Sequence, residues 1–308
     1  RKSPNVKESA SKVDARSENN HVHYFDGIRV IAAFVVVMVH SASSRVSRYG
    51  ELSSYEWNNA LIIDTFNRFP VPLFLMVSGY LLLARSEARN YRALTIKRVF
   101  RIVPPLLFWC ALFFVWQQFY YAESVSFEAL KSTLYSGMGG SHYYYLFIIL
   151  GLYFVAPLLS QLYSRNLIAY MTVLVLVTAL NLSGTTYQYI EINAFTYFLP
   201  FTMYLMLGPL VTKFQVGGIS ALMSIVVYLG VSAWMYFGTR YQYQTLPTGH
   251  YQLEYYLDYL RLPVLLQSLS IFVLIRFVMG FNGLALKRFF MVLSPLTFGI
   301  YLMHVVWL

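Results

Sequence analysis

Long apolar runs separated by short polar segments dominate the chain from residue 27 to its last residue. About 20 apolar residues in a row let a helix cross the hydrocarbon core of a bilayer. The runs lack strand-like alternation, and lipid cannot satisfy open backbone groups, so each span is expected to be helical. We predict nine spans, at residues 27–44, 67–84, 102–121, 143–163, 166–182, 195–212, 218–237, 260–280 and 290–308.

The composition agrees with a protein whose surface faces lipid. Charged residues make up 12% of the chain and hydrophobic residues 58%, whereas a soluble domain has about 25% charged residues. We therefore predict an all-α fold, a polytopic transmembrane helix bundle. The last run ends at "YLMHVVWL" with no cap and no basic flank, and we expect a tenth helix that is missing at the C-terminus. The single cysteine, Cys110, excludes a disulfide framework.

The basic residues are distributed unevenly between the two sides of the predicted bundle. The side that holds the N-terminus carries 16 of the 23 Lys and Arg residues, and the other side carries 6. The positive-inside rule therefore predicts a cytoplasmic N-terminus in a multi-pass protein of the cell membrane, plasma or inner. The net charge of +10 is thus explained by membrane topology, with lipid and not nucleic acid as the partner. Residues 1–23 are polar and are expected to form a disordered cytoplasmic segment.

The first span carries two ionisable residues on one stripe. Arg29 and His40 are eleven residues apart, which is 20° past three full turns of a helix, and they lie roughly 16 Å apart along its axis. Ionisable groups inside a span usually face the bundle interior or a watery cavity. Arg29 could also be a snorkelling anchor, and His40 could be a core histidine that bonds a backbone carbonyl. The separation suits a coenzyme A thioester whose phosphates lie near Arg29 and whose thioester reaches the depth of His40.

A second basic cluster precedes the third span. The stretch "LTIKRVFRIVPP" contains Lys97, Arg98 and Arg101, and residues three apart are neighbours on a helix face. Arginine forks match phosphate oxygens bidentately. An ordinary positive-inside flank would show the same residues, so both interpretations stay open.

Other polar residues fall inside or beside predicted spans. Ser78 and Tyr80 lie in the second span, where small residues also serve close helix packing, and His304 lies in the ninth at about the depth of His40. Residues 238–259 are rich in Tyr and Gln, as in an interfacial aromatic belt or a sugar-binding loop. The chain has no G-x-S-x-G, P-loop or metal-spaced His/Cys pair. It also has no acidic residue in the middle of a confident span, which argues against a proton-coupled transporter.

Four of these stretches resemble one known family. "FDGIRVIAAFVVVMVH", "VPLFLMVSGYLL", "IKRVFRIVPP" and "SPLTFGIYLMH" are similar, in order and in helix position, to motifs of membrane acyltransferase family 3. That family is typically ten-helical and moves acetyl or other acyl groups from cytoplasmic acyl-CoA to extracytoplasmic glycans. The resemblance spans nearly the whole chain and implies one acyltransferase transmembrane domain over residues 24–308.

The resemblance also implies roles for individual residues. His40 would be catalytic with Arg29 supporting it, and Arg98 and Arg101, with Lys97 beside them, would hold the phosphates of acetyl-CoA or another acyl-CoA. The acceptor would be a hydroxyl of a glycan or glycolipid in the cell envelope, and no metal is needed. His40 could act as a general base or as an acyl carrier. Further candidates for the cavity are Tyr80, Ser78 and His304, with Glu191 and Asp258 as orienting acids. The competing hypothesis is a transporter or flippase for a polar lipid or glycan.

Overall fold

The computed structural model describes residues 22–84, 91–120, 143–184, 195–247, 255–281 and 283–304, with the single residues 128, 131, 135 and 193. Within these ranges every regular element is a helix, as the apolar pattern predicts. Residues 1–21, most of the segment predicted to be disordered, lie outside the described residues, and the first helix begins at His23.

The described helices follow one another with short connections. They are α2 (His23–Val46), α3 (Ser54–Phe66), α4 (Pro70–Gly79) with a π-helical turn (Tyr80–Ala84), α5 (Tyr91–Tyr120), α7 (Tyr144–Arg165), α8 (Leu167–Ser183), α10 (Thr202–Val211), α11 (Gly218–Thr245), a 3₁₀ turn (Tyr255–Leu257), α12 (Leu262–Phe281), α13 (Leu284–Leu293), a 3₁₀ turn (Ser294–Leu296) and α14 (Thr297–Met303). Helix α11 continues to Thr245, so the first part of the stretch predicted to be a loop at 238–259 is helical.

Six helical segments in the described ranges are long and apolar enough to cross a membrane. They are His23–Val46, Ser54–Ala84, Tyr144–Arg165, Gly218–Thr245, Tyr255–Phe281 and Leu284–Met303. The spans predicted at 166–182 and 195–212 lie on the shorter apolar helices α8 and α10, and the one at 102–121 lies on α5. The count of nine spans is therefore not confirmed, although a multi-span helical architecture is.

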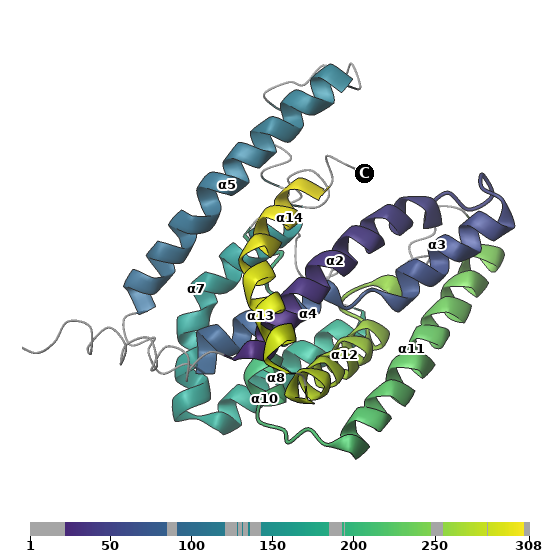
Figure 1. Ribbon diagram of the computed structural model, residues 1–308. Helices are drawn as coiled ribbons and strands as arrows, with labels where there is room; N and C mark the ends of the chain where they lie inside the picture. Colours follow the sequence, from purple (N-terminus) through teal and green to yellow (C-terminus); the bar gives the residue numbers. More distant parts are fainter. Residues whose placement is uncertain are drawn as a thin grey trace, which may run out of the picture.

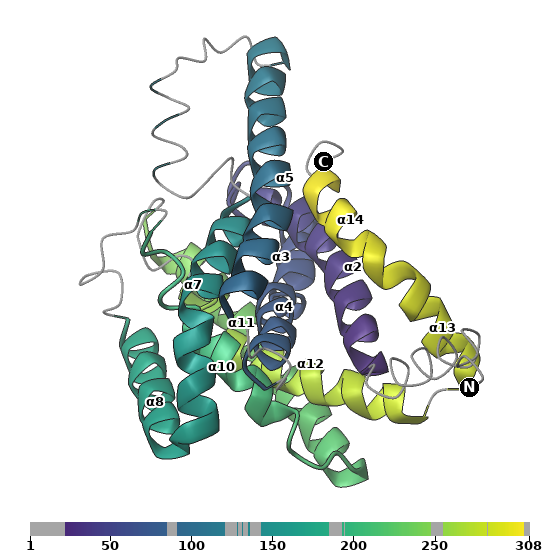
Figure 2. The same cartoon turned by 90° about the vertical axis from the view of Figure 1, so that its left-hand side faces the viewer.

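Helix α2 lies at the centre of the bundle (Figure 1). It packs against α3, α4 and α12 and also against α13 and α14, which run along it in Figure 2. The largest core joins α2 to α4, α7 and α10, and α4 is buried along almost its whole length. In both views one end of α5 projects beyond the other helices. Five of the described helices thus pack against α2, whereas Phe34 on the same helix is exposed.

The second predicted span is preceded by a helix that the apolar pattern did not separate from it. Helix α3 starts at a capping box, in which Ser53 Oγ accepts from Glu56 N at 3.2 Å and Glu56 Oε2 accepts from Ser53 N at 3.2 Å. It ends at Phe66, and α4 begins with Pro70 at its first position, where a missing N–H costs nothing. The three residues between them interrupt the helical path, and this α3–α4 break lies against the core.

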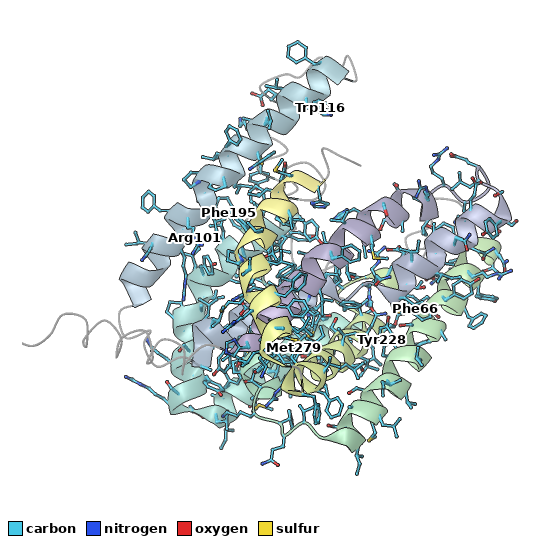
Figure 3. The ribbon with its side chains drawn as sticks, in the orientation of Figure 1. Phe66, Arg101, Trp116, Phe195, Tyr228 and Met279 are labelled. Carbon is cyan, nitrogen blue, oxygen red and sulfur yellow. The ribbon has the colours of Figure 1, made fainter. Side chains whose placement is uncertain are left out.

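Backbone groups freed by the break are bonded by side chains of other helices. Gln267 Nε2 of α12 donates to Thr65 O at 2.8 Å, and the Tyr228 hydroxyl of α11 donates to Phe66 O at 2.9 Å; Figure 3 shows Tyr228 beside Phe66. Irregular backbone at membrane depth survives only where protein or a water-filled cavity satisfies it. Side chains of α11 and α12 therefore satisfy the carbonyl groups that the α3–α4 break leaves without a helical partner.

Two glycines let α4 and α10 cross in close contact. A Cβ placed on Gly79 would overlap the carbonyl of Leu205, and one on Gly208 would overlap the carbonyl of Met76. Small residues at such crossings allow backbones to approach. Ser78 and Gly79 are adjacent, so this crossing also fixes the position of Ser78.

We expect Gly79→Ala to destabilise the folded protein by about 1–3 kcal/mol, because the added methyl forces two packed backbones apart. The measurement is thermal unfolding in detergent. Gly230→Ala is the matched control, because its Cβ meets no atom within 4 Å and alanine favours a helix over glycine. An equal melting temperature for Gly79→Ala and Gly230→Ala would contradict this account.

Candidate functional site

A cavity of about 410 Å³ lies beside the Arg29 end of α2. Its polar lining brings together residues from four helical segments, namely Arg29, Ser78, Arg98, Arg101 and Tyr153. Its apolar lining consists of Leu81, Leu82, Ile102, Pro295, Phe298 and Gly299. We call it the cationic cavity. Figure 3 shows Arg101 on the half of α5 that lies alongside the bundle, with Trp116 towards the projecting end.

The arginines of the cationic cavity are held differently. Arg29 Nη1 lies 3.4 Å from Oδ1 of Asp26, a buried residue one turn earlier on α2. The Arg98 guanidinium lies over the Tyr153 ring, 5.8 Å from its centroid, a cation–π contact that leaves the charge in place. Of these three arginines only Arg29 pairs with a carboxylate in the described part of the chain. The cavity is therefore positively charged, and its guanidinium groups suit phosphate oxygens.

A second, much smaller cavity lies next to His40, farther along α2. It has a volume of about 10 Å³, room for about one water molecule. We call it the histidine cavity, and its lining is Val36, Val39, His40, Pro70, Val71, Tyr144, Tyr145, Tyr259 and Tyr301. Four tyrosines and one imidazole thus line this small cavity together with apolar side chains.

His304 lies directly beside His40. The two ring centroids are 4.9 Å apart, with the rings inclined at 48°. His304 is buried, and its Nδ1 lies 2.7 Å from the carbonyl oxygen of Tyr301. When Nδ1 carries the proton and donates to that carbonyl, Nε2 is the acceptor of the ring. His40 and His304, which the sequence places at similar depths in the first and last apolar runs, are therefore in contact.

Tyr145 connects the two cavities. It lines the histidine cavity and packs against Tyr301, with ring centroids 5.5 Å apart. Its hydroxyl also interacts with the Ser78 hydroxyl and with the Arg29 charge, both of which belong to the cationic cavity. The two cavities consequently follow one another along the same side of α2, with Tyr145 between them.

The remaining candidates from the sequence lie apart from these linings. Lys97 is exposed on α5 and does not line the cationic cavity. Tyr80 packs against Phe25 with ring centroids 5.1 Å apart. Asp258 pairs with Arg261 at 3.2 Å, one residue from the cavity residue Tyr259, and Glu191 lies outside the described residues.

The expectation that no acidic residue lies in the middle of a span is wrong. Asp64 has no exposed surface and lies within the candidate span Ser54–Ala84. It pairs with Arg68, with Oδ2 and Nη2 2.5 Å apart. The Asp–Arg spacing of four residues was a signal for this pair, but the predicted span began only at residue 67. The lack of membrane carboxylates therefore no longer argues against a transporter.

The sequence interpretation also does not identify the tyrosines of the two cavities. Tyr144 and Tyr145 belong to the run "HYYYLF". Tyr153 follows on the same helix, Tyr259 lies in a turn before α12, and Tyr301 is on α14. Tyrosine is common at membrane interfaces, so its presence did not distinguish a cavity from a belt. The local signals are the run of three tyrosines and the tyrosine-rich stretch 238–259, which contains Tyr259.

Fold and site together define a multi-pass helical membrane protein with a cationic cavity and a paired-histidine cavity. The family model for the acyltransferase domain of acyltransferase family 3 matches residues 22–308. The chain belongs to this family, and it is a membrane acyltransferase. No curated protein and no solved structure matches it in the comparisons made.

We expect a cysteine at position 78 to be reachable from the cationic cavity. In a chain carrying Cys110→Ala, Ser78→Cys should react with a small anionic thiol reagent roughly ten times faster than Val77→Cys, because thiols react fastest in accessible electropositive surroundings. Val77 is the adjacent residue and is buried. The measurement is the labelling rate in detergent, and equal rates at the two positions would contradict an open cavity.

Proposed function

We propose that this acyltransferase moves acetyl from cytoplasmic acetyl-CoA to a hydroxyl group of an extracytoplasmic glycan or glycolipid in the cell envelope. The proposal rests mainly on one observation: the cationic and histidine cavities lie consecutively on one side of α2 and meet at Tyr145. A donor with a phosphate-rich head, a long thin arm and a reactive thioester fits that order.

In the proposed function, the donor acetyl-CoA binds in the cationic cavity. Arg98 and Arg101 bind the phosphates of the coenzyme A nucleotide, and Arg29, steadied by Asp26, lies deeper on α2. Charge-assisted bonds from arginine forks to phosphate are strong and directional. The excess of basic residues on the N-terminal side supports a cytoplasmic location for this cavity.

In the proposed function, the acyl transfer takes place at the histidine cavity. His40 takes the proton from the acceptor hydroxyl while its oxygen attacks the thioester carbonyl, or else His40 attacks first and carries the acyl group. His304 lies against His40 and is tied to Tyr301, so it acts as a positioning residue. In either mechanism the acceptor approaches from the side of the membrane opposite to the nucleotide.

We expect the double variant Arg98→Ala/Arg101→Ala to bind acetyl-CoA at least about tenfold more weakly, because each lost charged hydrogen bond is worth about 1.5–3 kcal/mol. Calorimetry, or the rise in melting temperature that a ligand of the folded state produces, measures this on purified protein. Arg165→Ala is the control, since Arg165 is an exposed arginine at the end of α7 outside both cavities. Undiminished binding by the double variant would remove the donor from this cavity.

We expect His40→Ala to lower acetyl transfer by about 10²–10⁴-fold, the usual contribution of a general base, while acetyl-CoA binding is retained. The assay follows radiolabelled acetyl from acetyl-CoA into an envelope glycan fraction of the source cells. Phe34→Ala is the matched control, because Phe34 is exposed on the same helix.

Two results of that assay are decisive. Transfer that survives in His40→Ala would contradict the role of His40, and transport of solute without thioester consumption would favour a transporter. A label that stays covalently on the wild-type protein in a single turnover, and is absent from His40→Ala, would select the acyl-carrier mechanism.

A further inference from the structure

A partly buried cluster of three polar side chains, with Asp64 fully buried, lies at the α3–α4 break. Arg68 Nη2 lies 2.5 Å from Asp64 Oδ2 and donates to Ser43 Oγ at 3.3 Å. Ser43 Oγ in turn donates to Asp64 Oδ1 at 3.2 Å. The Asp64 side chain is fully buried and that of Arg68 is 15% exposed. The guanidinium is therefore fixed by a carboxylate and a hydroxyl from two different helices.

The free-energy cost of burying the Asp64–Arg68 ion pair points to a role other than packing. Removing two charges from water costs several kcal/mol per ion, and well-packed apolar residues often replace a buried pair without loss of stability. The break that presents Arg68 is itself supported by bonds from Gln267 and Tyr228 to α3 carbonyl oxygens. Four helices, α2, α3, α11 and α12, thus contribute to the surroundings of one arginine.

The cluster adjoins the histidine cavity at the end away from Arg29. Ser43 follows His40 by three residues, so their side chains are neighbours on one face of α2. Pro70 and Val71, two and three residues after Arg68, line the cavity with His40. The charge of Arg68 acts on His40 and also on Asp258, which is itself paired with Arg261. The His304 ring also lies beside His40.

The proposed reaction creates a negative charge at this place. When the acceptor oxygen attacks the thioester carbon, the carbonyl electron pair moves to the oxygen, while His40 takes the hydroxyl proton. When the carbonyl re-forms, the coenzyme A thiolate leaves and takes that proton back, which yields an ester and free thiol. Preorganised hydrogen-bond donors and positive groups that face such an oxyanion are usually the largest single contribution to catalysis of acyl transfer.

We infer that Arg68 is a further catalytic residue, whose guanidinium, held by Asp64 and Ser43, stabilises the oxyanion formed on the thioester carbonyl. This inference rests on the proposed function, because it needs a thioester at His40. It assigns the two ends of one path to different arginines. Arg29, Arg98 and Arg101 hold the donor, and Arg68 acts on the reacting carbonyl. Asp64 is a positioning residue for Arg68.

The test separates catalysis from structural support. Arg68→Gln alone leaves Asp64 buried without its ion pair, and this loss can unfold the protein. The double variant Asp64→Asn/Arg68→Gln removes both charges and leaves an amide that can form hydrogen bonds at each position, although glutamine is shorter than arginine. Arg48→Gln is the matched control, because Arg48 lies beyond the same end of α2 in an exposed pair with Glu51. Each protein is purified, checked by melting temperature and acetyl-CoA affinity, and assayed for acetyl transfer to the envelope glycan fraction.

We expect the double variant to melt near the wild-type temperature, to bind acetyl-CoA with unchanged affinity, and to lose about 10²–10³-fold in kcat. Arg68→Lys should fall between it and the wild type, because a lysine keeps the charge without the fork. A double variant with wild-type kcat would overturn the inference, as would a raised acceptor KM with kcat unchanged. If the wild type and His40→Ala transfer acetyl equally, or neither does, the proposed function fails and the role of Arg68 fails with it.

Discussion

Lipid cannot hydrate a charge, and the placement of the ionisable side chains beside the two cavities agrees with that constraint. Arg29 is near enough to a buried aspartate to pair with it and also opens onto the cationic cavity. His40 lies against a second histidine and a set of tyrosines. Arg68 is held by a carboxylate and a hydroxyl. Asp26 and Ser43 of α2 and residues of the helices around it supply these partners, so the surroundings of α2 serve both electrostatics and packing.

The same constraint explains why one helical path is broken. An uninterrupted helix from Ser54 to Ala84 would bond its own carbonyl groups, whereas this path stops at Phe66 and resumes at Pro70. The freed carbonyl groups bond to α11 and α12, which ties three parts of the chain to one depth. Beyond the break, the close crossing of α4 and α10 at Gly79 holds Ser78 in the cationic cavity. Interruption and close packing therefore position neighbouring residues of the two cavities.

The sequence predicted the features that depend on the spacing of residues along a single helix. The spacing of Arg29 and His40 along one stripe, and of Arg98 and Arg101 along one face, corresponds to positions beside consecutive cavities. The contact of His304 with His40 was only suggested by depth, because it depends on how the last helix packs against the first. Tyr153 and Tyr259 could not be placed, since nothing local shows which face of a uniformly apolar helix meets a neighbour. Asp64 was missed because the apolar run was read as starting after it, although the helical path includes it.

The different sizes of the two cavities bear on the chemistry proposed for them. A thioester can be lost to water as well as transferred to a sugar, and exclusion of water is one way in which buried sites prevent such side reactions. The cationic cavity, at about 410 Å³, has room for part of a ligand together with solvent. The histidine cavity, at about 10 Å³, has room for about one water molecule and is walled by aromatic rings and branched aliphatic side chains. In the proposed reaction, an acyl group at His40 would therefore be separated from bulk water. An acceptor hydroxyl that displaces the remaining water would then react beside the Arg68 guanidinium, which needs no reorientation when charge develops.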